Sequence, residues 1–404
     1  MRSAKLPQPV KIRRTYKYRL YASKRDKRLH QQIDVAGNIW NHALAVQKRY
    51  HRLTGKYINK HRLMSHIARM RRTERFGYWQ LVGSQAVQDV VERLDKAYMR
   101  FFAYRRGELS IKTGPPRFKK VKKYKSFTLK QAGWKLLGGN RLRLNGRNYK
   151  FALSRPINGN IKTVTVKRDQ AGRLFVCFSV IEEISNPQVE VSTGKIGGFD
   201  FGLKTFLTDD EGGEHLSPEC LKANLSEIGR LNRQLARKQV GSNNRRKAKR
   251  QLVLAHDKVA NQRRDAHFKL THQLCDEYDV LGFETLNLHG MKKLWGRKVS
   301  DLGFAQFVLI LEHVAHMSGK QVVKIGRWEP TSQTCSCCGH RQAIELQERW
   351  FVCNECGLEV GRDHNAARNI RREAIAIVIA MLGVGASTPS LEGVRRSEMI
   401  ASLA

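Results

Sequence analysis

The chain has 404 residues, 41% of them hydrophobic, which is enough to bury more than one core, and we expect two or three domains. Its 75 lysines and arginines against 35 acidic residues leave a formal net charge of +40. Such an excess is unusual in a small-molecule enzyme, because self-repulsion destabilises the compact state unless a polyanion offsets it. The composition therefore favours a nucleic-acid partner, bound through its phosphates, over a merely basic soluble surface.

The N-terminal part predicts one strand followed by helices. Residues 12–21 alternate polar and apolar side chains, which is typical of a half-exposed strand, here with a basic face. Ser23 is expected to cap the first helix. Apolar residues then recur at helical spacing in three stretches, 29–44, 60–70 and 87–102. We interpret these stripes as core packing.

Strand patterns return after this helical block. Strands are predicted at 149–153, 161–167 and 174–182, and a hairpin turn containing Gly172 joins the last two. Because one strand precedes the helices and others follow, the first strand is expected to join the later ones in a single sheet. The helices would then be an insertion.

The second half, after an expected linker at 187–193, alternates strands and helices. The predicted elements are strands at 195–199 and 205–208 around Gly202, a helical region at 218–278 broken at 241–244, a strand at 280–284, a helix at 301–317, a strand at 321–325 and a helix at 364–383. No apolar run reaches the roughly 18–20 residues of a membrane helix, and residues 1–21 lack the apolar core of a signal peptide. We therefore expect a cytoplasmic protein without membrane contact.

Two CxxC pairs, Cys335/Cys338 and Cys353/Cys356, predict a structural zinc site. They are separated by 14 residues, and each CxxC turn points two thiolates at one centre, which gives the tetrahedral sulfur site that zinc prefers. The alternative is a set of free or redox thiols. Cys337 is a fifth thiol and is expected to point away. Four cysteine ligands leave no open position for catalysis.

Three separated carboxylates form a second constellation. Asp200 and Glu284 each stand at the end of an apolar strand, and Asp363 stands at the start of a helix. Singly, they could be a turn residue, an edge residue and an N-cap. Together they indicate an RNase H-like nuclease, in which two Mg²⁺ ions about 4 Å apart take hard oxygen ligands during in-line phosphodiester attack.

At this point the sequence resembles a known family. Residues 331–339, 353–357 and 363–369 look like the C-terminal signature of TnpB proteins, which are RNA-guided nucleases encoded by insertion sequences and ancestors of the type V CRISPR effectors. Residues 198–204 and 283–287 are similar to that family's first and second RuvC motifs. The resemblance spans nearly the whole chain and is most specific from 197 to 370.

The resemblance implies an α+β multidomain layout. A wedge β-barrel would be interrupted by a helical recognition domain, and an RNase H-like (RuvC) α/β domain by a zinc ribbon. The implied boundaries are 1–22 plus 110–186 for the wedge, 23–109 for the recognition domain, 194–330 plus 358–384 for RuvC and 331–357 for the ribbon. The small and polar composition of 385–404 separately predicts a disordered tail.

The resemblance also implies the chemistry and its residues. Asp200, Glu284 and Asp363 fall on the family's catalytic acids, which would hold a pair of Mg²⁺ ions. One departure is Gly361, where the family commonly has a further aspartate. The implied protein is an RNA-guided DNA endonuclease of a transposable element, a monomer with its guide RNA that cuts double-stranded target DNA beside a short motif. The alternatives are a nuclease-inactive RNA-guided repressor and, less favoured, a strand-transfer transposase.

Two basic segments are the expected nucleic-acid surfaces. Residues 117–130 combine seven lysines and arginines with aromatic rings and suit guide RNA. The segment 230–264 holds 12 lysines and arginines and is densest at 245–250. The resemblance implies that it lies beside the guide–target heteroduplex and contacts its backbone. The candidate residues are Arg117, Lys119, Lys120, Lys122, Lys123, Tyr124, Arg245, Arg246, Lys247, Lys249, Arg250, Arg263 and Arg264. A solvated basic face is the alternative for both.

Overall fold

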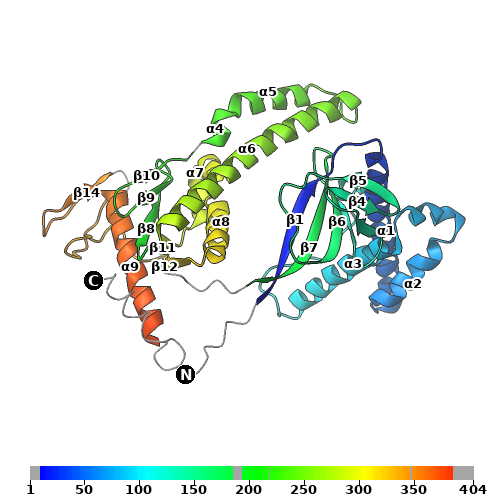
Figure 1. The fold of residues 1–404 in the computed structure, drawn as a ribbon, viewed down its shortest axis with the longest axis horizontal. Helices are drawn as coiled ribbons and strands as arrows, with labels where there is room; N and C mark the ends of the chain where they lie inside the picture. Colours follow the sequence, from blue (N-terminus) through cyan, green and yellow to red (C-terminus); the bar gives the residue numbers. More distant parts are fainter. Residues whose placement is uncertain (1–9, 185–192, 218, 346–347, 385–404) are drawn as a thin grey trace. The chain divides into compact units, whose positions relative to one another are not determined.

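The computed structural model describes residues 10–184, 193–217, 219–345 and 348–384. Two compact units, Met1–Asn186 and Pro187–Ala404, make up the chain (Figure 1). The expected tail at 385–404, and all but the last residue of the expected linker at 187–193, lie outside the described residues. No described helix has the length and apolar character needed to cross a membrane.

A four-stranded antiparallel sheet in the order β1-β7-β6-β2 forms the base of the first unit. Its strands are β1 (Val10–Arg19), β2 (Ser126–Leu129), β6 (Asn160–Arg168) and β7 (Leu174–Ile184). β1 pairs with β7 along its whole length, with Tyr16 opposite Phe178, so the prediction that the first strand joins the later ones is confirmed. β6 and β7 form the predicted hairpin.

The predicted helical block is confirmed between β1 and β2. Its elements are α1 (Asp26–Thr54), α2 (Lys60–Met70), the 3-10 helix η1 (Glu74–Leu81), α3 (Ser84–Arg105) and the short η2 (Val121–Lys123). The apolar stripes of the helices and one face of the sheet share a single core that includes Ile33, Val90 and Phe178. The predicted stripes are therefore core packing, as interpreted.

The predicted cap of α1 is wrong. The helix begins at Asp26, and Ser23 lies three residues before it. Both the backbone N–H and the Oγ of Ser23 donate to the Asp26 carboxylate, at 3.2 and 2.9 Å. An acidic residue in the first turn is favoured by the helix dipole, so Asp26 holds the entering chain in place of a serine cap.

The strand pairs of the first unit do not close a barrel. β3 (Trp134–Leu136), β4 (Arg141–Leu144) and β5 (Arg147–Lys150) form a separate sheet. Among the described residues, β2 pairs with a strand on one side only. On its other side Asp89 accepts from the N–H of Thr128 (3.0 Å) and Arg93 donates to the carbonyl of Ser126 (3.1 Å). Side chains of α3 thus satisfy the groups that a closing strand would need, and the expected closed wedge barrel is not found.

A five-stranded sheet in the order β10-β9-β8-β11-β12 forms the base of the second unit. Its strands are β8 (Ile196–Phe201), β9 (Leu207–Asp209), β10 (Glu214–His215), β11 (Val280–Glu284) and β12 (Gln321–Ile325). β8, β11 and β12 are parallel, and β9 and β10 add antiparallel pairs. The strands predicted at 280–284 and 321–325 are confirmed to the residue.

Helices cover both faces of this sheet. The helices of this unit are α4 (Cys220–Ala223), α5 (Leu225–Ala236), α6 (Asn243–Glu277), α7 (Leu288–Leu302), α8 (Phe304–Met317) and α9 (Arg362–Val384), and α4 and α5 pack on α6. α9 lies on one side of the strands and α8 on the other (Figure 1). Ser242 caps α6 by accepting from the N–H of Arg245, so the break in the helical region lies earlier than predicted. The helix predicted at 301–317 is divided at Gly303, whose φ is 68°.

Two glycines allow α9 to approach the sheet closely. A Cβ on Gly198 of β8 would lie 2.2 Å from the carbonyl oxygen of Ala367, and one on Gly282 of β11 would lie 2.8 Å from the Cβ of Ala374. The helix backbone therefore rests directly on the central strands. Any side chain at Gly198 would push the first turns of α9 away.

Gly198→Ala should consequently destabilise the protein. Overpacking of this kind costs about 1–3 kcal/mol, and here the obstacle is backbone that cannot rotate aside. Thermal melting of the variant should show a lower midpoint. Gly296→Ala on α7 is the matched control, since a Cβ there meets nothing within 4 Å. Equal midpoints for the two variants would contradict the close-approach argument.

Candidate metal centre and carboxylate site

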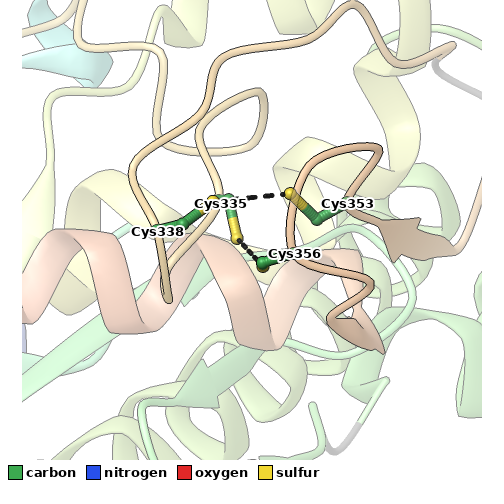
Figure 2. Close-up of side chains that lie close together, drawn as sticks. All are labelled: Cys335, Cys338, Cys353 and Cys356. Atoms are coloured by element: carbon green, nitrogen blue, oxygen red, sulfur yellow. Dashed lines mark hydrogen bonds between the residues drawn. The ribbon is translucent and has the colours of Figure 1, made fainter.

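The four predicted cysteines form one cluster. The Sγ atoms of Cys335 and Cys356 lie 3.6 Å apart, as do those of Cys338 and Cys353, and all four lie within 4.8 Å of one another. Figure 2 shows the side chains converging from two loops. With Zn–S bonds of about 2.3 Å, the edges of a regular tetrahedron measure about 3.8 Å. The cluster therefore has the spacing of a four-sulfur metal site.

Backbone N–H groups in this cluster stabilise the thiolate of Cys353. Hydrogen bonds from the backbone N–H of Cys356, and then of Glu355, lower the pKa of Cys353 to about 6. Gly339 and Gly357 follow the two pairs with φ of 79° and 69°, as the tight turns require. A two-stranded ribbon, β13 (Trp350–Val352) and β14 (Glu359–Gly361), carries the second pair.

Three carboxylates meet at the edge of the five-stranded sheet. Asp200 and Glu284 directly follow the paired residues Phe199 and Phe283 on neighbouring parallel strands. Side chains two residues apart in a strand point to the same face, and Gly198 and Gly282 face α9, so Asp200 and Glu284 project toward that helix as well. Asp363 lies in the first turn of α9.

The three carboxylates interact electrostatically. Burial, and then repulsion from the Glu284 and Asp363 carboxylates, raises the pKa of Asp200 well above its usual range. Burial also raises the pKa of Glu284. Within the described residues only the cysteines bring three or more metal-ligating atoms within 4.8 Å, so the acids stand farther apart. A pair of ions about 4 Å apart needs wider spacing than one ion, and the acids could hold such a pair.

Sequence reasoning missed an acid that supports this edge. Asp210 follows β9, and its Oδ1 accepts from the N–H of Gly198 at 2.9 Å. His364, next to Asp363, donates through Nε2 to the carbonyl of Asp210 at 3.0 Å. Arg371 of α9 lies 3.4 Å from the other oxygen of Asp210. The only signal in the sequence was a second acid after the strand at 205–208, which is also common in plain turns.

Comparisons with known proteins find similar sequences along most of the chain. A family model described as a probable transposase matches residues 178–294, and one described as a Cas12f1-like TNB domain matches residues 304–370. A protein of Streptomyces pristinaespiralis, provisionally named an RNA-guided DNA endonuclease, is 28% identical over 374 residues, which cover 90% of each chain. TnpB-like protein L79 of Acanthamoeba polyphaga mimivirus is 28% identical over 238 residues, or 55% of this chain and 45% of that protein.

The chain is similar to the TnpB proteins. The resemblance noted from the motifs is thereby confirmed. A chain from a solved Cas12f1–sgRNA–target DNA complex aligns with a TM-score of 0.54 and 13% identity, covering 89% of this chain and 99% of that one. At that identity the likeness concerns the fold alone.

Charge and interleaved aromatic rings predicted the first basic segment, 117–130, as an RNA surface, and in the structure the tyrosine of that segment is buried. The Lys119 amino group lies 3.5 Å above the Trp40 ring, and Lys122 pairs with Asp34. Tyr124 is only 4% exposed and packs on Gly37 of α1. Its buried ring is not available to stack on a base. The basic candidate residues Arg117, Lys119, Lys120, Lys122 and Lys123 are all exposed.

The candidate residues of the second basic segment lie on α6. Two of them are hydrogen-bonded to other helices, and the others are exposed. Arg245 donates to the carbonyls of Leu235 and Lys238, both at 2.8 Å, and so closes the end of α5. Arg263 donates to the carbonyl of Ser300 at 2.8 Å. These two arginines therefore hold neighbouring helices. The exposed members are Arg246, Lys247, Lys249, Arg250 and Arg264.

Proposed function

We propose that this chain is an RNA-guided DNA endonuclease of a transposable element. Its guide RNA pairs with one strand of double-stranded DNA beside a short motif, and a RuvC-type site in the second unit cuts the DNA. The observation that carries the proposal is the meeting of Asp200, Glu284 and Asp363 at one sheet edge. The names of the relatives and the net charge of +40 support it.

The carboxylates suit Mg²⁺, because hard oxygen ligands are those it prefers. Asp200 and Asp363 would hold the ions, and Glu284 would complete the site. Bound Mg²⁺ supplies an activated water and charge stabilisation at the leaving oxygen. The products would carry a 5′-phosphate and a 3′-hydroxyl. Gly361 ends β14 two residues before Asp363, and the proposed site needs no aspartate there because the three acids supply its ligands.

The four cysteines would hold one structural zinc ion. Their sulfur spacing matches a tetrahedral site, and all four positions are filled by the protein. The ribbon they form lies between Glu284 and Asp363 in the sequence, within the proposed nuclease domain. The zinc would thus shape the substrate entrance and would take no part in the chemistry.

Purification of the full chain with its bound RNA tests the proposal. Sequencing should reveal one discrete RNA, and the complex should cut only DNA that matches the variable end of that RNA, in the presence of Mg²⁺. Guide-dependent binding without cutting would identify the repressor instead. RNA-independent strand joining would identify the transposase. Either result would reject the proposed endonuclease.

The exposed lysines of α6 provide a prediction about the nucleic-acid surface. Lys247→Ala and Lys249→Ala should each weaken binding of guide–target heteroduplex regardless of its sequence. Each should also lower the slope of log affinity against log salt by about 1, because one phosphate contact is lost. Filter binding across salt concentrations measures both quantities.

The matched control for these lysines is on the same helix. Lys269 is exposed on α6 but pairs with Asp265 at 2.9 Å. Lys269→Ala should leave the salt slope unchanged. If all three substitutions behaved alike, α6 would be a solvated basic face.

A further inference from the structure

Two asparagines of α9 hold the loop that leads into the first cysteine pair. Asn365 donates through Nδ2 to the carbonyl of Thr334 (2.8 Å) and accepts from the N–H of Ser336 (2.9 Å). Asn369 donates to the carbonyls of Thr331 (2.8 Å) and Thr334 (2.7 Å). The two side chains are 0% and 2% exposed. Water cannot replace these bonds without opening the contact.

The asparagines bind the loop on both sides of a metal-ligating cysteine. Thr334 and Ser336 flank Cys335, so the bonds made by Asn365 fix the backbone that aims this thiol. This loop follows β12 in the chain. It is closed by a hydrogen bond from the N–H of Cys335 to the carbonyl of His340, at 2.8 Å. A metal ion bound by the four cysteines would therefore order the same segment to which the asparagines are hydrogen-bonded.

The same helix carries a carboxylate of the proposed nuclease site. Asn365 and Asn369 are four residues apart and lie on one face of α9. Asp363 is two residues before Asn365, which places it about 200° around the helix, on the opposite side. The loop thus holds one side of the first turns while the other side presents Asp363 to β8. A shift of the loop would move the helix start and the carboxylate with it.

The contact of α9 with the sheet makes the position of Asp363 sensitive to small movements of the helix. The Ala367 carbonyl lies against Gly198, which has no side chain that could rotate to absorb a movement of the helix. α9 is therefore held between the loop on one side and the central strands on the other. Metal-bound loops are more ordered than empty ones, because ligands fixed to one ion lose their independent motion.

We propose that Asn365 and Asn369 are positioning residues that couple zinc binding at the four cysteines to divalent-metal binding at Asp200, Glu284 and Asp363. The inference rests on the proposed function for the identity of the second site. Such coupling is reciprocal: each metal tightens the other by the same factor, and couplings in proteins are typically about 5–150-fold. A purely local role, in which the asparagines only pair buried backbone, would stabilise the ribbon without any linkage between the metals.

The test measures metal binding without relying on cleavage. Mn²⁺ serves as the probe of the carboxylate site, and its affinity for the RNA-bound full chain is measured by electron paramagnetic resonance with the zinc present and after its removal. The release of Zn²⁺ to a colorimetric chelator is timed with and without saturating Mn²⁺. In the parent protein, removing zinc should weaken Mn²⁺ binding at least about 5-fold, and Mn²⁺ should slow zinc release.

Asn365→Asp and Asn369→Asp keep the side-chain size but replace the amide donor. While still holding one zinc ion, each variant should reduce the coupling below about 2-fold. Asn354→Ala is the control, because this exposed residue of the second cysteine turn is bonded through its backbone N–H. It should keep the parental coupling. If an aspartate variant lost its zinc, the milder Asn369→Gln would be measured in its place.

Two results would overturn the inference: no coupling in the parent, or full coupling in zinc-loaded asparagine variants. Guide-directed cleavage by the parent is recorded in parallel. A parent that binds Mn²⁺ with coupling but cuts no guide-matched DNA would reject the proposed function alone. A parent that cuts DNA without coupling would reject only the present inference.

Discussion

Asp200→Asn should abolish cleavage of guide-matched DNA and at the same time raise the melting temperature of the metal-free protein. The Asp200 carboxylate is buried beside the carboxylates of Glu284 and Asp363, and these surroundings raise its pKa. Asparagine has the same shape but no charge, so it removes the repulsion and the desolvation cost together. It also removes a ligand from the proposed Mg²⁺ site, which should slow cleavage by at least about a thousand-fold.

The opposite signs of the two effects make this prediction specific. Cleavage is measured in single turnover with saturating guide-bound protein, and stability by thermal melting without divalent metal. Asp265→Asn is the matched control, because this acid is exposed on α6 and pairs only with Lys269 in the same helix. It should change neither quantity. Unimpaired cleavage by Asp200→Asn would show that the three carboxylates are not the active site.

Cys353→Ser should release the zinc and reduce cleavage. Cys353 is buried in the small core of the ribbon, and a structural zinc ion contributes directly to folding free energy. Without it the loop bonded to α9 loosens, so we expect cleavage to fall at least about ten-fold as the start of the helix shifts. Zinc content is measured by atomic emission, and cleavage under the same conditions as for the parent.

The fifth cysteine provides the control for this experiment. Cys337 is exposed and lies outside the cluster of four. Cys337→Ser should retain one zinc ion and parental cleavage. A Cys353→Ser protein that remains folded and cuts DNA as well as the parent would contradict this prediction. The zinc would then only stabilise the ribbon locally, and its proposed role in shaping the substrate entrance would be wrong.

The features that sequence predicted well depend on short segments. β11 is an apolar run that ends at Glu284, and β12 is a short segment of β-branched residues after a glycine-containing turn. The bounds of both strands were predicted to the residue. The four cysteines gather because each pair is brought together by its own turn. The edge position of Asp200 and Glu284 follows from the apolar strands that precede them. In each case the signal lies within a few residues of the feature.

The features that sequence could not predict depend on distant partners. The ring of Tyr124 is buried because Gly37, in another helix, leaves room for it. In the sequence the tyrosine stands among lysines and looks exposed. Asp210 resembles an ordinary turn acid until β8 brings the N–H of Gly198 to it. Arg245 looks like one of many phosphate-binding arginines, but it closes the end of α5.

The outer edge of β2 has a consequence for efforts to shorten this protein. Asp89 and Arg93 occupy that edge from within the segment 23–109 that resembles a separate recognition domain. A truncated version lacking this segment would expose the backbone N–H of Thr128 and the carbonyl of Ser126 to solvent. Bare strand edges recruit strands from other molecules. Removal of the helices should therefore yield an aggregating fragment, and a compact derivative would have to retain α3 or replace it with another cover for this edge.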